Sequence, residues 1–147
     1  MAGFELGTDG TTRILVGVDG SETSLRAAAY AAGLARRQGS HLIVLFVKTT
    51  SATSIAAPET TAAAQQSQSD IAADLQAEID ANAPRLGIDV ELVVREGNPY
   101  TELLGLAEER RVDAIVVGAS MQAGHKLVGS LASKLVRKAT WPVTVVP

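Results

Sequence analysis

Residues 118–130 form a glycine-rich loop with the composition of an anion-binding site, Gly-Ala-Ser-Met-Gln-Ala-Gly-His-Lys-Leu-Val-Gly-Ser. The loop follows an apolar run that ends at Val117 and precedes a segment with helical periodicity. A loop that leads from the end of a strand into a helix directs backbone N–H groups and the positive end of the helix dipole at one place, which favours a phosphate. The structural alternatives are a tight turn at Gly118 and an ordinary helix start with Ser130 as its cap.

Other residues could act on the nucleoside part of a ligand. Asp19 ends an apolar run that begins at Arg13, so its carboxylate could accept a hydrogen bond from a ribose hydroxyl or an exocyclic amine. The same position suits an acid that caps a helix or forms an Asx turn. Val47 ends the second apolar run, where its backbone could line a base. His125 and Lys126 lie within the loop, where a cation could reach an anion, although solvent exposure is the simpler explanation.

Other chemistry-bearing motifs fail on spacing or composition. A P-loop requires Gly, four residues, Gly, Lys and then Ser or Thr, but here His125 precedes Lys126 and Leu127 follows it. The chain has no cysteine, so disulfides and cysteine-ligated metals are excluded. Its two histidines, His41 and His125, stand in separate segments, which favours packing or surface roles over a metal site or a catalytic triad. We therefore assign no catalytic residue and no metal ligand.

The composition of the 147-residue chain limits its classes of function. A formal net charge of −3 argues against nucleic acid as the main partner, because binding to a phosphate backbone depends on a basic excess. No apolar run approaches the roughly 18 residues of a membrane-spanning helix, and the first residues lack the basic and apolar regions of a signal peptide. We expect a cytoplasmic protein that binds neither nucleic acid nor a membrane.

The elements that position the loop follow from an alternation of patterns. Short apolar runs predict five strands, and segments with a helical period separate them, with strands expected at 13–19, 41–47, 88–94, 112–117 and 141–147. This alternation predicts a single-domain α/β fold, an open parallel five-stranded sheet with helices on both faces. If the first and fourth strands are neighbours, Asp19, Val47 and Gly118 meet at the carboxyl edge of the sheet, where such folds bind ligands.

The remaining segments complete the organisation. We expect residues 1–11 to be a loose tail before a domain at 12–147, and residues 49–69 to be a mobile loop that is either a lid or disordered. A helix follows from about Ser69, ended by Pro84 and Gly87. The apolar stripes of the first and last helices are expected to face the core, and they consist of Leu25, Ala28, Ala29, Ala32 and Ala35, and of Leu131, Leu135 and Val136.

Several of these stretches together resemble the universal stress protein family. They are Ile14–Ser24, Gly97–Pro99, Asp113–Gly118, Gly129–Ser130 and Pro142–Val146, in the order of the family. The resemblance implies a parallel sheet of strand order 3-2-1-4-5, four helices and a homodimer whose last strands pair antiparallel. The chain ends on a bare apolar strand, which independently invites such pairing.

The loop is similar to that of the ATP-binding branch of the family. In that branch two residues separate the first glycine from the second, nine residues separate the second from the third, and Ser or Thr follows the third. Gly118 and Gly129–Ser130 match its ends, but Met121 replaces the middle glycine and the loop is two residues shorter. Gly124 is a candidate replacement, since glycine tolerates the same conformations. The resemblance implies nucleotide-binding roles for Gly17, Val18, Asp19, Val47, Val117, Gly118, Ser120, Gly124, His125, Gly129, Ser130 and Leu131.

The leading hypothesis is a homodimeric stress-response sensor or regulator that binds ATP or another adenine nucleotide, with or without Mg²⁺. No residue is an obvious general base, so efficient ATP hydrolysis is not expected, although slow hydrolysis is compatible with the site. The alternative is a nucleotide-free dimeric interaction module of the same fold, which Met121 and the shortened loop favour. A third hypothesis, an adenylate-forming or ATP-hydrolysing enzyme, ranks last because no catalytic histidine pair or Ser-Gly-Gly signature is present.

Overall fold

The computed structural model describes residues 10–49, 58–121 and 130–147. Its single sheet is parallel throughout and has the order β3-β2-β1-β4-β5, which confirms the predicted topology. Nine elements follow one another along the described residues: β1 (Arg13–Val18), α1 (Glu22–Gln38), β2 (His41–Lys48), α3 (Pro58–Leu86), β3 (Asp89–Glu96), α4 (Pro99–Arg110), β4 (Ala114–Gly118), α5 (Ser130–Lys138) and β5 (Val143–Val146).

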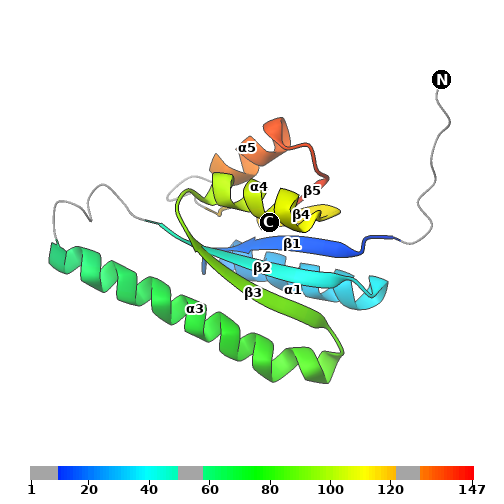
Figure 1. Ribbon diagram of the computed structural model, residues 1–147, viewed down its shortest axis with the longest axis horizontal. Coiled ribbons are helices and arrows are strands. Elements are labelled where there is room, and N and C mark those ends of the chain that lie inside the picture. The colour runs from blue at the N-terminus through cyan, green and yellow to red at the C-terminus, as the bar shows by residue number, and fades with distance from the viewer. Residues whose placement is uncertain (1–9, 50–57, 122–129) are drawn as a thin grey trace.

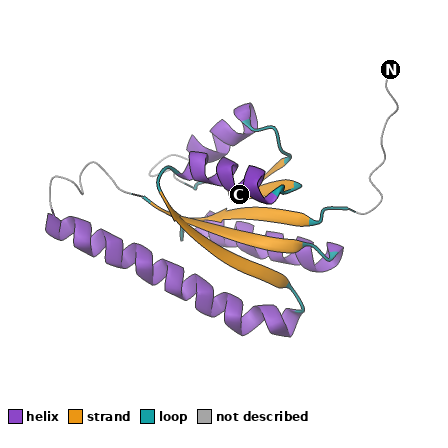
Figure 2. Cartoon of the chain, viewed as in Figure 1, coloured by secondary structure: helices purple, strands orange, loops and turns teal. Residues whose placement is uncertain are grey.

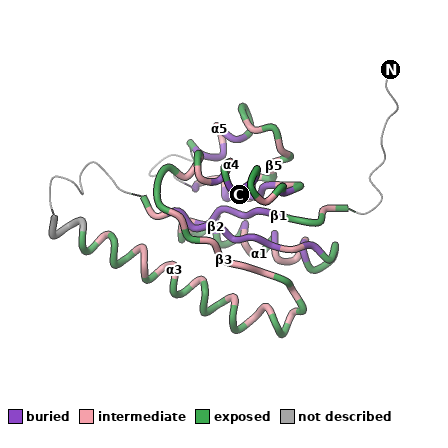
Figure 3. Tube along the Cα trace, viewed as in Figure 1, coloured by how far each residue is buried: buried purple, intermediate pink, exposed green. Residues whose placement is uncertain are grey.

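The sheet is the middle of three layers. Helices α1 and α3 cover one face, and α4 and α5 cover the other (Figures 1 and 2). In β1, Ile14 and Val16 pack toward α1, whereas Leu15 packs toward α4 and α5. Because both faces are covered, the central strands are buried along their length, as Figure 3 shows for β1 and β2. This is why their sequences are continuous apolar runs rather than alternating ones.

Specific capping residues set the helix boundaries near the strand ends. The Ser21 side chain accepts a hydrogen bond from the Ser24 N–H at the start of α1, and Gly39 ends the helix with a φ of 67°. Asn98 caps α4 in the same way, with Pro99 as its first residue. Each cap satisfies a backbone group that the helix itself leaves unpaired. The short linkers therefore fix where each helix begins relative to the strand before it.

The prediction of a loop over 49–69 is wrong from Pro58 onward, because α3 begins there and runs to Leu86. The segment is rich in Ala and Gln, which are strong helix formers, and it holds no glycine. Its lack of large apolar residues hid the helix, since helical periodicity depends on an apolar stripe. Pro84 does not end the helix either; the chain leaves it at Gly87, which has a φ of 67°.

The two predicted apolar stripes are right in part. In α1 the fully buried side chains are Ser24, Ala27, Ala31 and Ala35, so of the predicted stripe Ala35 is fully buried, and Ala28 and Ala32 are partly buried against the core. Leu25 is 48% exposed and, with Ala28, Ala29 and Ala32, faces the gap between α1 and α3. In α5, Leu131 and Leu135 are buried as predicted, but Val136 is 64% exposed. Apolar residues surround more of these helices than one buried stripe needs, so the sequence did not specify which side faces the sheet.

Candidate functional site

The candidate site lies where the order of the strands reverses, between β1 and β4. These two strands are parallel neighbours, with Val16 opposite Val116, so both end at the same edge of the sheet. Asp19 follows the last residue of β1, and Gly118 is the last residue of β4. Val47 lies near the end of β2 on the other side of β1, where Val18 is opposite Phe46. The predicted meeting of these strand ends at one carboxyl edge is therefore confirmed.

Asp19 is held in place by the turn that leads into α1. Its Oδ1 atom accepts a hydrogen bond from the Ser21 N–H at 2.9 Å, and its own N–H donates to the Ser24 Oγ at 3.2 Å. The Ser24 hydroxyl in turn donates to the carbonyl oxygen of Ser21. This is the Asx turn that the position allowed, so the side chain has a structural role. The same contacts fix the carboxylate at the carboxyl edge of the sheet.

Gly118 is required by close packing rather than by an unusual backbone angle. A Cβ atom at this position would lie 2.5 Å from the Ser24 nitrogen and 2.6 Å from the Thr23 Oγ1. Real Cβ atoms do not approach backbone atoms so closely, so any other residue would push α1 away from β4. The first turn of α1 therefore rests directly on the end of β4, and it reaches the point where the glycine loop begins.

A hydroxyl pair fastens the start of the loop to α1. The Ser120 N–H donates to the Thr23 Oγ1 at 3.1 Å, and the two hydroxyl oxygens are 2.6 Å apart. On the other side, the Ala119 N–H donates to the carbonyl oxygen of Val146 in β5. The sequence analysis included Ser120 but missed Thr23, because a threonine in the first turn of a helix carries no signal of a distant partner.

Met121 belongs to the core. It is only 3% exposed, and its N–H donates to the carbonyl oxygen of Gly118 at 3.2 Å, which closes a turn. Its Cε atom lies 3.3 Å from where a Cβ at Gly17 would be, with Leu103 on the same side. Gly17 thus leaves room for the methionine. The residue that replaces the middle glycine of the family pattern therefore fills the space above β1.

The other predicted site residues have different surroundings. Val18 and Val117 are fully buried, Val47 is 7% exposed and Leu131 is 3% exposed, so their side chains support the edge and only their backbones could meet a ligand. Ser130 is the first residue of α5 and lies in a hollow of about 230 Å³ with Asn98 and Pro99 of α4. Gly124, His125 and Gly129 lie outside the described residues.

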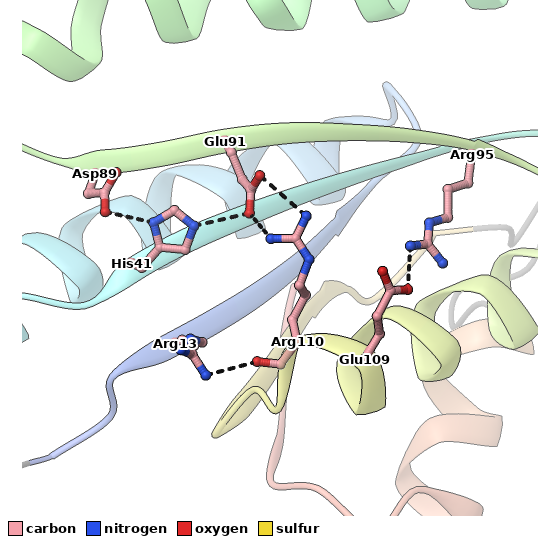
Figure 4. A network of polar contacts seen from close by, with 7 residues as sticks. All are labelled: Arg13, His41, Asp89, Glu91, Arg95, Glu109 and Arg110. Atoms are coloured by element: carbon pink, nitrogen blue, oxygen red, sulfur yellow. Dashed lines mark hydrogen bonds and ion pairs between the residues drawn. The ribbon is translucent and has the colours of Figure 1, made fainter.

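The opposite edge of the sheet carries a network of polar and charged side chains that was not predicted from the sequence (Figure 4). The Nε2 atom of His41 lies 3.1 Å from the Glu91 Oε1, and its Nδ1 lies 2.8 Å from the Asp89 Oδ2, a close contact without hydrogen-bond geometry. Arg110 of α4 also pairs with Glu91 and accepts through its carbonyl from Arg13. His41 is therefore a packing residue at the amino ends of β2 and β3, far from the candidate site.

The contacts of Glu91 in this network lower its pKa. Burial raises the pKa, but hydrogen bonds from His41 and Arg110, with the charge of Arg110, outweigh it and bring the pKa below its ordinary value. At the same edge, hydrogen bonds from the backbone N–H groups of Arg13 and Thr12 lower the pKa of Asp113. Within the described residues, no three acids or histidines are grouped as a metal site would need.

Comparison with known proteins gives a consistent result. The sequence profile of the universal stress protein family matches residues 10–147. The universal stress protein YxiE of Bacillus subtilis is 30% identical, over 91% of this chain and 97% of its own length. The universal stress protein MJ0531 of Methanocaldococcus jannaschii is 28% identical, over 91% of this chain and 81% of its own.

A solved universal stress protein in complex with cAMP is 25% identical to this chain and has a TM-score of 0.69 against it, covering 93% of this chain and 97% of that one. In the part of the chain that the structure describes, no helix is both long and apolar enough to span a membrane.

Proposed function

The chain belongs to the universal stress protein family, and from this premise we propose that it is a cytoplasmic regulator of the stress response that binds an adenine nucleotide, with ATP as the first candidate. The observation that carries the proposal is that Asp19 and the turn at Gly118 lie together where the strand order reverses. A relative with this fold was solved in complex with cAMP. Ligands of open α/β sheets bind at this position.

Each candidate residue has a distinct role in the proposal. Asp19 and the backbone at Val47 would hold the nucleoside, because they lie at the ends of adjacent strands. Gly118, Gly124 and Gly129, with Ser130 at the start of α5, would hold the phosphates through backbone N–H groups and the helix dipole. Any Mg²⁺ would be held mainly by the phosphates, since no group of acids within the described residues offers a metal site of its own.

We assign no enzymatic activity. Asp19 is the described acid that ends β1 at the candidate site, and its Oδ1 accepts a hydrogen bond from the Ser21 N–H. General base catalysis needs a group within reach of the attacking water and with a suitable pKa. The proposed role is therefore binding and signalling, with at most slow hydrolysis of ATP.

The proposed assembly is a homodimer through β5. This strand is at the edge of the sheet, so one row of its backbone N–H and C=O groups faces outward. Beside it lies an open hollow of about 550 Å³ lined by residues of α5 and β5, among them Val136 and Val145. Antiparallel pairing of two such strands would cover both features. Light scattering at increasing protein concentration should give twice the monomer mass.

A nucleotide-free interaction module remains the second candidate. It is favoured by Met121, which is buried and replaces the middle glycine of the family pattern. It is also favoured by the close packing of Gly118 against α1, which accounts for this glycine without a ligand. The two functions differ in whether the purified protein carries a bound nucleotide.

Mass spectrometry of small molecules released on denaturation should find an adenine nucleotide in amounts comparable to the protein. A protein that carries none, and that also gives no heat when titrated with ATP, AMP or cAMP, would leave the interaction module as the function. In a protein that binds, substitution of Gly129 by Ala should weaken binding and leave the dimer intact.

A further inference from the structure

A second hollow lies on the other side of the molecule, between α1 and α3. It has a volume of about 380 Å³, its floor is β2 and β3, and twelve of its fourteen lining residues are apolar. A neighbouring hollow of about 450 Å³ shares Leu25, Leu75 and Glu78 with it and reaches Gly20. Together they form a trough along the two helices, which we call the α1–α3 trough.

The trough exists because the two helices do not fill the space between them. The wall on α1 consists mainly of alanines, Ala28, Ala29 and Ala32, whose side chains are too short to reach α3. Helix α3 packs loosely, since none of the residues from 62 to 86 is fully buried (Figure 3). Its apolar residues Leu75 and Ile79 reach the sheet but leave Leu25 of α1 exposed. A hollow lined almost entirely by apolar side chains has the character of a small-molecule site.

The size and shape of the trough determine which class of molecule fits it. Its volume is in the range of about 300–1,000 Å³ that small-molecule sites have. A hollow of this volume between two helices and a sheet suits a slender occupant better than a second α-helix, which is about 10 Å across. An extended hydrocarbon chain is thin enough and could lie along the alanine wall. The trough therefore suits a rod-shaped apolar molecule rather than a protein partner.

The charged side chains on the rim of the trough determine which polar head group an apolar ligand could have. The charged side chains that line the trough are two acids, Asp74 and Glu78, one helical turn apart on α3. Of the basic residues nearest in sequence, Arg26 pairs with Glu22 and the carbonyl of Pro147. Arg85 donates to Asn82, which lines the trough and donates to Glu78, so two acids face one arginine on this rim. A carboxylate or phosphate head group would be repelled here, whereas an ammonium group would be attracted.

We propose that the α1–α3 trough binds a cationic amphiphile, a molecule with a linear apolar body and an amine or quaternary ammonium head. The apolar body lies against Ala28, Ala29 and Leu75, and the head faces Asp74 and Glu78. The trough ends at Gly20, where the Ile71 side chain packs against the backbone next to Asp19. The site is separate from the crevice between β1 and β4, and the proposal does not depend on nucleotide binding.

Three related fluorescent rods test the proposal on the full-length protein: diphenylhexatriene, its trimethylammonium derivative and its propionate derivative. All three gain fluorescence in an apolar site. The cationic derivative should bind saturably at one molecule per chain, about three- to tenfold more tightly than the anionic one, as expected for one or two exposed ion pairs. Failure of the cationic derivative to saturate, or equal affinity for the two charged forms, would overturn the proposal.

Matched variants locate the site. Ala29→Phe should fill the trough and abolish the fluorescence, whereas Ala77→Phe, on the exposed side of α3, should not. Asp74→Asn with Glu78→Gln should remove the preference for the cation but keep binding of the neutral rod. Asp70→Asn with Asp80→Asn makes the same change in net charge on the same helix, outside the trough, and should keep the preference. If Ala29→Phe binds the cationic rod like the wild type, the trough is not the site.

Discussion

Polar groups at the strand ends are arranged differently at the amino edge and at the carboxyl edge of the sheet. At the amino edge, charged side chains from β2, β3 and α4 neutralise one another, as in the contacts of Glu91 with His41 and Arg110. At the carboxyl edge, the contacts of Asp19 and Thr23 join a carboxylate or a hydroxyl to backbone N–H groups. The partners of Glu91 are therefore side chains, whereas turns and a helix start organise the ends of β1 and β4.

We propose that the amino edge serves stability and the carboxyl edge serves binding. Side chains that satisfy one another across three elements hold the fold together and offer little to a ligand. Backbone N–H groups arranged around a glycine-rich turn retain the geometry of an anion site even when a side chain also uses part of it. Altering the amino edge should therefore change stability and its pH dependence, and altering the carboxyl edge should also change ligand binding.

The largest effect on stability is expected from Gly118→Ala. The added methyl would lie 2.5 Å from the backbone of α1, so the helix must move, at a cost of about 3 kcal/mol, the upper end for overpacking. Urea unfolding measures the loss. Gly105→Ala in α4 is the control, because a Cβ there has nothing within 4 Å and should stabilise the helix by up to about 1 kcal/mol. Equal stability of the two variants would contradict the close packing.

Glu91→Gln tests the amino edge and should cost about 1 kcal/mol at neutral pH, a discounted value because the side chain is about one-third exposed. The folded-state pKa of Glu91 lies below its unfolded value, so the unfolded chain binds the proton first. Its stabilisation is thus complete above about pH 4.3 and is lost as the pH falls through the folded pKa.

Urea titrations between pH 3 and 7 should therefore show that the wild type and Glu91→Gln converge in stability at low pH. The exposed Glu108→Gln serves as the control for the change in charge. A difference between wild type and Glu91→Gln that stays constant down to pH 3 would show that the charge of Glu91 does not stabilise the amino edge.

An effect similar in size to that of Glu91→Gln is expected from Thr23→Val at the carboxyl edge. The substitution keeps the shape but removes the acceptor of the Ser120 N–H, at a cost of about 1 kcal/mol. Hydrogen exchange at the Ser120 amide should accelerate. Ser120→Ala keeps this acceptor and loses only the contact between hydroxyls, so its effect should be smaller. If Ser120→Ala is the more damaging of the two, the backbone contact is not what holds the loop.

The sequence was sufficient for the architecture because alternating strands and helices restrict the topology to few possibilities. The sheet order was implied by the resemblance to the family, and with that order the placement of Asp19 and Gly118 followed from the strand ends. The first half of α3 was missed because a helix rich in Ala, Thr and Gln has no apolar stripe to reveal its period. The rotation of α1 was missed because alanines lie on both its sheet side and its α3 side.

The contacts between distant side chains could not be predicted from the sequence. His41 and Glu91 are 50 residues apart and meet only through the register of β2 with β3. Thr23 and Ser120 are 97 residues apart and meet because Gly118 lets α1 approach β4. The buried position of Met121 depends likewise on the absence of a side chain at Gly17. Such pairs depend on register and close approach, which local patterns do not encode.

The most direct test of nucleotide binding at the carboxyl edge is calorimetric titration of ATP with Mg²⁺ into the wild type and into Asp19→Asn. The asparagine oxygen can still accept from the Ser21 N–H, so the turn survives while the negative charge is lost. The account predicts one saturable site per chain in the wild type, weakened about tenfold or more in the variant, with unchanged unfolding. Identical titrations, or the absence of binding to the wild type at high protein concentration, would contradict it.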